Sequence, residues 1–466
     1  MTWQRSRPDE ADASAEADAL SPIAAVRLQV HELQTADEAT STTLSADSRD
    51  PAISEDERSD LNNVKQRTGE TQSPPPPPPP PPPTKVLFLD GIRGLAAMLV
   101  VVQHSGRFYP SLHLGSVAVD AFFILSSFLL TWLFMKKSLK LIAQRASVRT
   151  WAIAILDYFQ KRFFRVYPLF ALVATVIWLL PYRYQSRCFY VSKSTHVNLF
   201  KMLTFDSDQR FHVLWTLPLE IAYYFIIPVF VLATIAMRRF WLVGAVPAMV
   251  WIVYEGYTYE RQSHMPLRPH MHTFVMGSLA AVAYVKLDTR IQKTSFQLLW
   301  WHKLLIRVVE GLIILLMLSV CFRGLLFDWV VANPAAPPKG FPFSSVFMAV
   351  IIVIEMMLPS CVSAMFEWNV FRFWGKISFS IYLLHTFVLK YQVISAQPYF
   401  INRFVAYLVL TNALATVSYY LVEYPSHLLA QRISRFLAAR EKSDAATYTS
   451  VEKTVSKERG SETEGR

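Results

Sequence analysis

Long apolar runs separated by short polar segments make up most of the chain after residue 85. About ten of these runs have the roughly 17–25 residues that an α-helix needs to cross a bilayer. The runs at 239–254 and 271–287 are the shortest of them. The pattern predicts an all-α fold, a polytopic membrane bundle of about ten transmembrane helices. The expected helices span 86–105, 117–135, 163–181, 215–236, 239–254, 271–287, 304–322, 343–360, 374–395 and 403–423.

The segments outside these runs differ in character. Residues 1–73 contain much Ala, Ser, Asp and Glu and few aromatic residues, which predicts a disordered acidic tail. Ten consecutive prolines open segment 74–84, expected to be a polyproline II linker that is either a spacer or a docking site for a proline-binding domain. The basic segment 136–162 is expected to lie at the membrane surface. These boundaries leave a membrane domain at 85–430 and a disordered cytosolic tail at 431–466.

Composition and charge favour a membrane protein and exclude several other classes. Hydrophobic residues make up 53% of the chain and charged residues 17%, whereas soluble domains average about 25% charged residues. The net charge is +11, and because the acidic tail contributes about −8, the rest of the chain carries about +19. Many of the basic residues lie in short loops, which is typical of membrane topology rather than of nucleic-acid binding. The three scattered cysteines have no metal-binding spacing, so no metal and no tightly bound cofactor are expected.

Lys and Arg residues in the loops predict the orientation of the chain. If the N-terminus is cytosolic, the inner loops carry about 17 of these residues and the outer loops about 12. The bias predicts a multi-pass protein with both termini in the cytosol. The long acidic and proline-rich N-terminal region is typical of eukaryotes, so we expect an endomembrane or the plasma membrane.

The first apolar run carries ionisable residues that membrane helices rarely contain. A charge near the bilayer centre costs about 2.5–3.5 kcal/mol on insertion scales, so Arg93 in this run indicates a function. Arg93 and His104 are eleven residues apart, which places them on one helix face about 16 Å apart along the axis. Arginine suits phosphate recognition and histidine is the usual general base, so the pair is spaced for an extended donor such as acyl-coenzyme A. The structural alternatives are a snorkelling arginine and a histidine that only hydrogen-bonds at the membrane boundary.

Two acidic residues are expected near the outer ends of later helices. Asp120 lies near the start of the second apolar run, and Glu220 lies about one turn into the fourth. Both are expected at the depth of His104, where a carboxylate would orient the imidazole for deprotonation of a hydroxyl group. The alternative for Asp120 is a first-turn acid stabilised by the helix dipole.

Polar residues on two further helices complete the candidate site. Arg162 and Arg165 are helical neighbours at the cytosolic side, where they form either a phosphate clamp beside Arg93 or a positive-inside anchor. Tyr382 and His385 share one face of an otherwise apolar run, which predicts that they line a cavity. His385 is equally typical of a structural hydrogen-bonding residue.

Six sequence motifs follow one another along the apolar region. They are "LDGIRGLAAMLVVVQH" with its Arg-x10-His spacing, "VAVDAFFILSSFLL", "RFFRVYP", "LWTLPLEIAYYFIIP", "ISFSIYLLH" and "VEYP". In this order, and across about residues 85–429, the series resembles the acyltransferase-3 family of integral membrane O-acyltransferases. Two positions depart from the family pattern, because Ser127 replaces the usual glycine and Thr216 the usual serine.

The resemblance implies that the protein transfers an acyl group, usually acetyl, from cytosolic acyl-coenzyme A to a hydroxyl group of a sugar, glycolipid or metabolite. It implies that His104 is the catalytic base or a transient acyl carrier, with Asp120 and Glu220 as supporting catalytic residues. The acceptor is expected to be reached by the membrane domain itself. The residues implied to bind the donor or shape its pocket are Arg93, Arg162, Arg165, Tyr382 and His385.

Two other functions fit parts of the pattern. In a secondary transporter or permease of small molecules, the charged membrane residues would form a proton relay or a substrate site. The sequence shows no internal repeat and no paired broken helices, which such transporters often have. A non-catalytic sensor or scaffold would use the proline-rich tail. The leading prediction is a membrane acyltransferase whose partners are acyl-coenzyme A, a hydroxylated acceptor and the lipid bilayer, without nucleic acid.

Overall fold

The structure is a computed structural model that describes residues 84–106, 114–193, 196–258, 264, 266–294, 297–322, 326 and 342–440. Within these residues every regular element is a helix, which confirms the predicted all-α class. The predicted acidic tail, nearly all of the polyproline linker and residues 441–466 lie outside the described part. The α-helices of the described part are α3 (Thr84–His104), α4 (Leu114–Ala143), α5 (Val148–Leu179), α6 (Tyr182–Phe189), α7 (Leu199–Leu203), α8 (Thr216–Ala236), α9 (Trp241–Thr258), α10 (Met271–Thr294), α11 (Trp300–Cys321), α13 (Pro342–Met357), α14 (Cys361–Phe366), α15 (Asn369–Lys376), α16 (Ser378–Leu389), α17 (Gln392–Ser395) and α18 (Phe400–Ser418).

Several of these helices are long and apolar enough to cross a membrane. By length and composition there are five candidate spans in the described part, and two shorter apolar helices accompany them. A chain with this many apolar helices is a multi-pass membrane protein. The five candidate spans are Leu87–His104, Leu114–Ala143, Val148–Leu179, His212–Ala236 and Phe400–Arg440.

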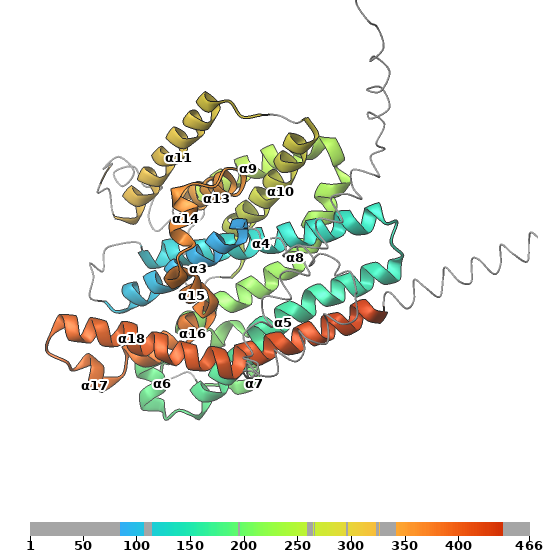
Figure 1. The fold of residues 1–466 in the computed structure, drawn as a ribbon. Coiled ribbons are helices and arrows are strands. Elements are labelled where there is room, and N and C mark those ends of the chain that lie inside the picture. The colour runs from blue at the N-terminus through green and yellow to red at the C-terminus, as the bar shows by residue number, and fades with distance from the viewer. Residues whose placement is uncertain are drawn as a thin grey trace, which may run out of the picture. The chain divides into compact units, whose positions relative to one another are not determined.

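α4 lies in the middle of the bundle and packs against α8, α10 and α13 (Figure 1). Its closest neighbour is α10, where Gly277 allows the two backbones to approach, since a Cβ at this position would overlap the Ser127 hydroxyl. Inside this contact, Thr131 of α4 donates a hydrogen bond to Ser278 of α10, and Ser278 also bonds the Tyr223 hydroxyl of α8, both at 2.8 Å. Small residues and shared hydroxyl groups thus hold the three helices together, as is usual between membrane helices.

α4 and α5 are longer than a bilayer requires. With 30 and 32 residues they are about 45 and 48 Å long, against about 30 Å for a hydrocarbon core. Most of segment 136–162, which the sequence predicted at the membrane surface, forms the end of α4 and the first half of α5. Ser147 begins α5 as its N-cap, accepting a hydrogen bond from the Thr150 amide at 3.3 Å.

The last helix continues beyond its expected end. The sequence predicted a helix over 403–423, but a π-helical turn at Tyr419–Glu423 joins α18 to a helix that continues to Arg440. A π turn accommodates the backbone hydrogen bond that proline cannot donate. Residues 431–440 are therefore helical and not a disordered tail.

Side-chain hydrogen bonds hold this extension against α5. Ser434 donates to the Asp157 carboxylate at 2.5 Å, and the Gln160 amide donates to Ser434 at 2.8 Å. In Figure 1 the red helix that follows α18 runs beside α5. The last described turns of this helix are thus tied to the first half of α5.

The predicted helix at 374–395 is divided into α15, α16 and α17. α3 packs closely against α14 and α15, which precede α16, because it carries glycines where a side chain would collide. A Cβ on Gly91 would overlap the Phe366 carbonyl oxygen, and a Cβ on Gly94 would overlap that of Phe371. Gly375 in turn meets the Asp90 carbonyl oxygen. These contacts fix α16 alongside α3, which brings two predicted site helices together.

Candidate active site

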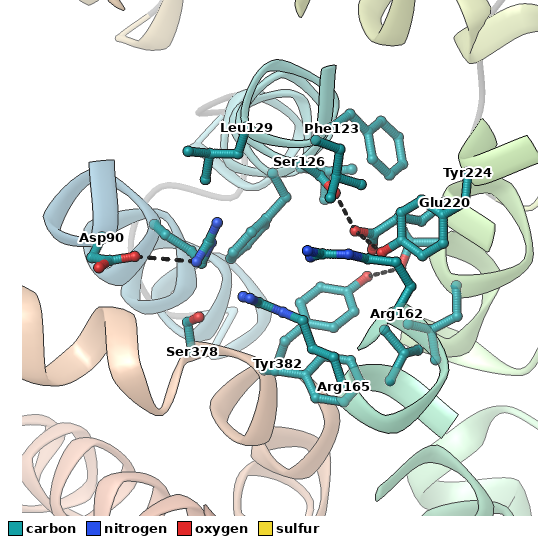
Figure 2. Close-up of a pocket in the computed structure, with 18 of the residues that line it drawn as sticks. Asp90, Phe123, Ser126, Leu129, Arg162, Arg165, Glu220, Tyr224, Ser378 and Tyr382 are labelled. Atoms are coloured by element: carbon teal, nitrogen blue, oxygen red, sulfur yellow. Dashed lines mark hydrogen bonds and ion pairs between the residues drawn. The ribbon is translucent and has the colours of Figure 1, made fainter. Parts of the chain in front are cut away.

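Three arginines from two helices line one cavity of about 260 Å³. Arg93 comes from α3, and Arg162 and Arg165 come from neighbouring positions of α5, as their spacing predicted. Figure 2 shows the side chains of Arg162 and Arg165 directed into this cavity. The arginines that the sequence grouped as a possible phosphate clamp therefore do lie together, and we call this space the arginine cavity.

The arginine cavity carries more positive than negative charge. Arg93 forms an ion pair with Asp90 at 3.3 Å, and the Asp90 side chain is 43% exposed at the edge of the cavity. Glu220 is held by neutral groups, because its carboxylate accepts hydrogen bonds from Ser126 and, at 2.6 Å, from Tyr224 (Figure 2). Two guanidinium groups remain, those of Arg162 and Arg165, and neither has a carboxylate within ion-pair distance in the part of the chain that the structure describes. Such a site suits an anion with several oxygens, such as a phosphate.

Tyr382 closes the arginine cavity on the side of α16. Its hydroxyl donates to the Val213 carbonyl at 3.0 Å and accepts from the Thr216 hydroxyl at 2.9 Å. The ring of Phe122 packs edge-on against it, with 5.8 Å between ring centroids. Phe122, Thr216 and Tyr382 all line the cavity, whereas His104 does not. The arginine cavity therefore does not extend to His104.

A cluster of three histidines lies beyond Tyr382, and we call it the histidine cluster. His385 is one turn further along α16, with its ring centroid 6.3 Å from that of Tyr382. The ring of His104, the last residue of α3, is nearly parallel to that of His385, with 5.1 Å between ring centroids and 3° between ring planes. His212, which begins a 3-10 turn before α8, has its ring 5.0 Å from that of His104. His385 is fully buried, whereas His104 is exposed.

Hydrogen bonds determine which nitrogen of each paired ring carries a proton. His385 Nδ1 lies 2.8 Å from the Tyr382 carbonyl oxygen and 3.2 Å from that of Ile381, and since a carbonyl only accepts, Nδ1 must donate. In neutral His385 the Nε2 atom is then an acceptor. His104 Nδ1 lies 2.8 Å from that Nε2 atom, so His104 carries its proton on Nδ1. The Nε2 atom of His104 keeps a lone pair, as a general base requires.

The two carboxylates expected beside His104 lie elsewhere. Glu220 faces the arginine cavity, two helical turns along the chain from His212. Asp120 is buried against α13, where it accepts a hydrogen bond from Ser344 at 3.0 Å. The prediction that a carboxylate orients the imidazole is therefore wrong, and His385 occupies that position instead. In the described part of the chain, no group of three or more His, Cys, Asp or Glu side chains is placed to hold a metal ion.

Comparison with protein families identifies the membrane domain. A family profile described as an acyltransferase domain matches residues 86–422, well over half of the chain. The chain belongs to the acyltransferase-3 family. Both the arginine cavity and the histidine cluster lie within the matched residues, whereas the helix that continues to Arg440 ends outside them.

One curated relative in this family comparison is an O-acetyltransferase, OatA of Staphylococcus aureus (strain MRSA252). It is 23% identical over 391 residues, which cover 77% of this chain and 60% of the relative. The chain therefore spans less than two thirds of the length of that relative. No solved structure matches the chain significantly.

The two departures from the acyltransferase-3 pattern are both accommodated. The Ser127 hydroxyl bonds back to the Phe123 carbonyl at 2.8 Å, and Gly277 provides the space that the extra side chain needs. Thr216 keeps a hydroxyl group and uses it on Tyr382. Neither change removes a group that the acyltransferase site uses.

His212 is the functional candidate that sequence reasoning missed in this acyltransferase. It lies in the connection before α8, where the spacing of hydrophobic residues does not predict the direction of a side chain. Its backbone has a φ of 46°, a left-handed conformation that is uncommon for residues other than glycine. The signal available in the sequence was a histidine immediately before the apolar "VLW" that leads into α8.

Proposed function

We propose that the protein moves an acetyl or other short acyl group from acyl-coenzyme A to a hydroxyl group of a sugar, glycolipid or secondary metabolite. The observation that carries the proposal is the His104–His385 pair. Buried His385 accepts the Nδ1 proton of His104, and this leaves a lone pair on Nε2 of His104. The family membership supplies the acyl transfer, and the cavity and the histidine cluster supply places for the two substrates.

The arginine cavity suits the phosphate groups of coenzyme A. Its volume of about 260 Å³ holds a phosphate-bearing part of the donor but not the whole of it. Arg93 and His104 are eleven residues apart on α3, which corresponds to about 16 Å along the helix axis. The pantetheine arm would cover that distance and bring the thioester to His104. Because Tyr382 closes the way in this structure, the arm would have to displace its ring.

The chemistry needs one proton carrier. His104 Nε2 removes the proton from the acceptor hydroxyl as its oxygen attacks the thioester carbonyl carbon. The carbon–sulfur bond breaks, and the leaving thiolate of coenzyme A takes the proton back from Nε2. A transient acyl-histidine is the alternative route, in which Nε2 itself attacks the thioester before the acceptor does. In both routes the hydrogen bond from His104 Nδ1 to His385 keeps the reacting nitrogen in place.

We further propose that about ten helices cross the membrane, with the arginine cavity open to the cytosol, the histidine cluster toward the opposite side and both termini cytosolic. The five long spans and the two shorter apolar helices of the described part support a multi-pass bundle. The membrane domain then corresponds to about residues 85–430, in an endomembrane or the plasma membrane. The cytosolic lengths of α4, α5 and the last helix would border the donor side.

The first experiment compares acyl transfer by the wild type and by a His104→Ala variant in detergent, with labelled acetyl-coenzyme A. The variant should lose at least about 100-fold in kcat/KM, because general bases contribute roughly 10²–10⁴-fold. A His302→Ala variant, changed on the distant helix α11, is the matched control and should keep its activity. Full activity of His104→Ala would refute the proposal, and since detergent abolishes any gradient, transfer there also excludes a purely transporting role.

A second experiment tests the arginine cavity by shortening the donor. Arg162→Gln should raise the KM for acetyl-coenzyme A by about tenfold or more, since a charge-assisted hydrogen bond contributes about 1.5–3 kcal/mol. The same variant should use S-acetylpantetheine, which has no phosphate, as well as the wild type does. Equal impairment with both donors would mean that Arg162 does not bind phosphate.

A further inference from the structure

A second set of residues surrounds His104 on the side away from the arginine cavity. His212 lies between His104 and Tyr190, with 5.0 Å to the first ring centroid and 5.2 Å to the second. The Tyr190 hydroxyl accepts a hydrogen bond from the Lys390 ammonium group at 2.8 Å. Tyr190 is 62% exposed, so the set is open to ligands. We call Tyr190, His212 and Lys390 the outer subsite.

Within the described residues, the outer subsite carries basic side chains and no carboxylate that is paired with them. Among the described residues, Lys390 has contacts only with Tyr190, and Arg187 donates only to Gln392 and Ser395, at 3.3 and 3.5 Å. Lys390 is close enough to interact electrostatically with the rings of both His104 and His212. Arg187 and the contact between Lys390 and Tyr190 are exposed, so both cations are accessible to a ligand from outside. A negatively charged ligand would supply a partner for them.

The backbone of the outer subsite is held in an unfavourable conformation. Tyr190 has a φ of 56° and His212 a φ of 46°, which for residues with a side chain costs about 1–2 kcal/mol each. The two strained residues place their rings against each other, so the strain and the ring contact belong to one local arrangement. Strained residues of this kind are concentrated at ligand-binding and catalytic sites.

We propose that the outer subsite binds an anionic group of the acyl acceptor, a carboxylate or a phosphate, while the acceptor hydroxyl faces His104. Lys390 pairs with the anion, Tyr190 supplies a hydroxyl and a ring for stacking, and Arg187 adds to the local positive potential. The rings of His104, His212 and Tyr190 follow one another at 5.0 and 5.2 Å, and Lys390 lies at the Tyr190 end of this row. The acceptor class is therefore an acidic or phosphorylated sugar or a similar anionic alcohol. The inference rests on the proposed function, because it assumes that the acceptor reacts at His104.

The test measures binding without turnover. Diethyl pyrocarbonate modifies neutral imidazole nitrogens, so its rate at His104, followed by peptide mass spectrometry, reports whether a ligand covers this ring. The wild type is titrated separately with glucose, glucuronate and glucose 6-phosphate. We expect the anionic sugars to protect at concentrations at least about tenfold lower than glucose does, and comparison of the two identifies the preferred anion. The preference should weaken at high ionic strength.

Variants assign the preference to the outer subsite. Lys390→Gln should reduce the ratio between anionic and neutral sugars to nearly one. Tyr190→Phe keeps the ring and removes the bond to Lys390, so it should lower the ratio without disturbing packing. Lys193→Gln changes an exposed lysine of the same connecting segment and should leave the ratio unchanged.

Three results would overturn the inference: equal protection by glucose and the anions, protection by none of the sugars, or an unchanged ratio in Lys390→Gln. None of these depends on acyl transfer. The proposed function fails separately, if His104→Ala retains full transferase activity, so the two failures can be told apart.

Discussion

Replacing His385 tests whether this buried residue controls the reactive form of His104. The change should act through one hydrogen bond, because His385 Nε2 is the atom that accepts the proton of His104 Nδ1 at 2.8 Å. His385→Leu keeps a similar size and removes the acceptor. His385→Gln places an amide oxygen at about the position of Nε2 and can still accept. The two variants therefore differ in whether they can accept this hydrogen bond, and they have similar side-chain volumes.

The expected loss follows from the hydrogen bond and the position of the ring. A neutral hydrogen bond contributes about 0.5–1.5 kcal/mol net, which is the preference that His104 would lose for the tautomer with a lone pair on Nε2. Without this bond the exposed ring can also turn away from its reacting position, at a further cost of similar size. Together they give about 1–3 kcal/mol, or roughly a 5- to 150-fold fall in kcat/KM for His385→Leu. His385→Gln should remain close to the wild type.

The assay combines kinetics with a direct reading of the tautomer. Acyl-transfer rates are measured for the wild type and both variants, and ¹⁵N NMR of labelled histidine reports which nitrogen of His104 is protonated. The wild type and His385→Gln should show His104 protonated at Nδ1, and His385→Leu a mixture of both tautomers. Equal losses in the two variants, with unchanged tautomers, would show that His385 only fills space and would refute the reasoning.

Three other predictions follow from packing and exposure. Gly277→Ala should lower the free energy of unfolding by about 1–3 kcal/mol, since its methyl group meets the Ser127 hydroxyl. In a thermal melt, adding Ser127→Gly should restore part of the loss, and an unchanged melting temperature in Gly277→Ala would contradict this prediction. A maleimide should label exposed Cys361 quickly and Cys188 slowly, because burial raises the pKa of the Cys188 thiol; equal rates would argue against this packing. Asp157→Asn should release the helix end, raising trypsin cleavage there about tenfold with acyl transfer intact, whereas unchanged cleavage would place its anchoring elsewhere.

Much of the fold could be predicted from hydrophobic spacing alone. The apolar runs located the long helices, and the eleven-residue spacing of Arg93 and His104 predicted that both lie on one face of α3. In the structure Arg93 lines a cavity with Tyr382 of α16, and His104 bonds His385 of the same helix. Helical periodicity is sufficient for such statements, because it fixes both the rise and the facing of residues within one element. It also grouped Arg162 with Arg165 on one face of α5.

The errors arise where one element ends and another begins. Glu220 was expected level with His104 because it stands near the start of an apolar run, but the 3-10 turn that begins at His212 precedes α8 and places the histidine there instead. The position of Asp120 in its run predicts a buried side chain. Hydropathy does not reveal whether that side chain packs against α3 or α13. The position of a residue within a run therefore predicts burial better than it predicts partners.

The pairing of α3 with α16 is what turns separate motifs into a site, and the sequence carries it only indirectly. Gly91 and Gly94 remove the side chains that would keep α3 away from the segment just before α16. Once α3 and α16 lie side by side, the two polar residues of α3 lie opposite the two polar residues of α16, in the same order along the helix axis. Arg93 then shares the arginine cavity with Tyr382, and His104 meets His385. The polar residues of each helix could be predicted from its own periodicity. They form the arginine cavity and the histidine cluster because small residues allow the two backbones to touch.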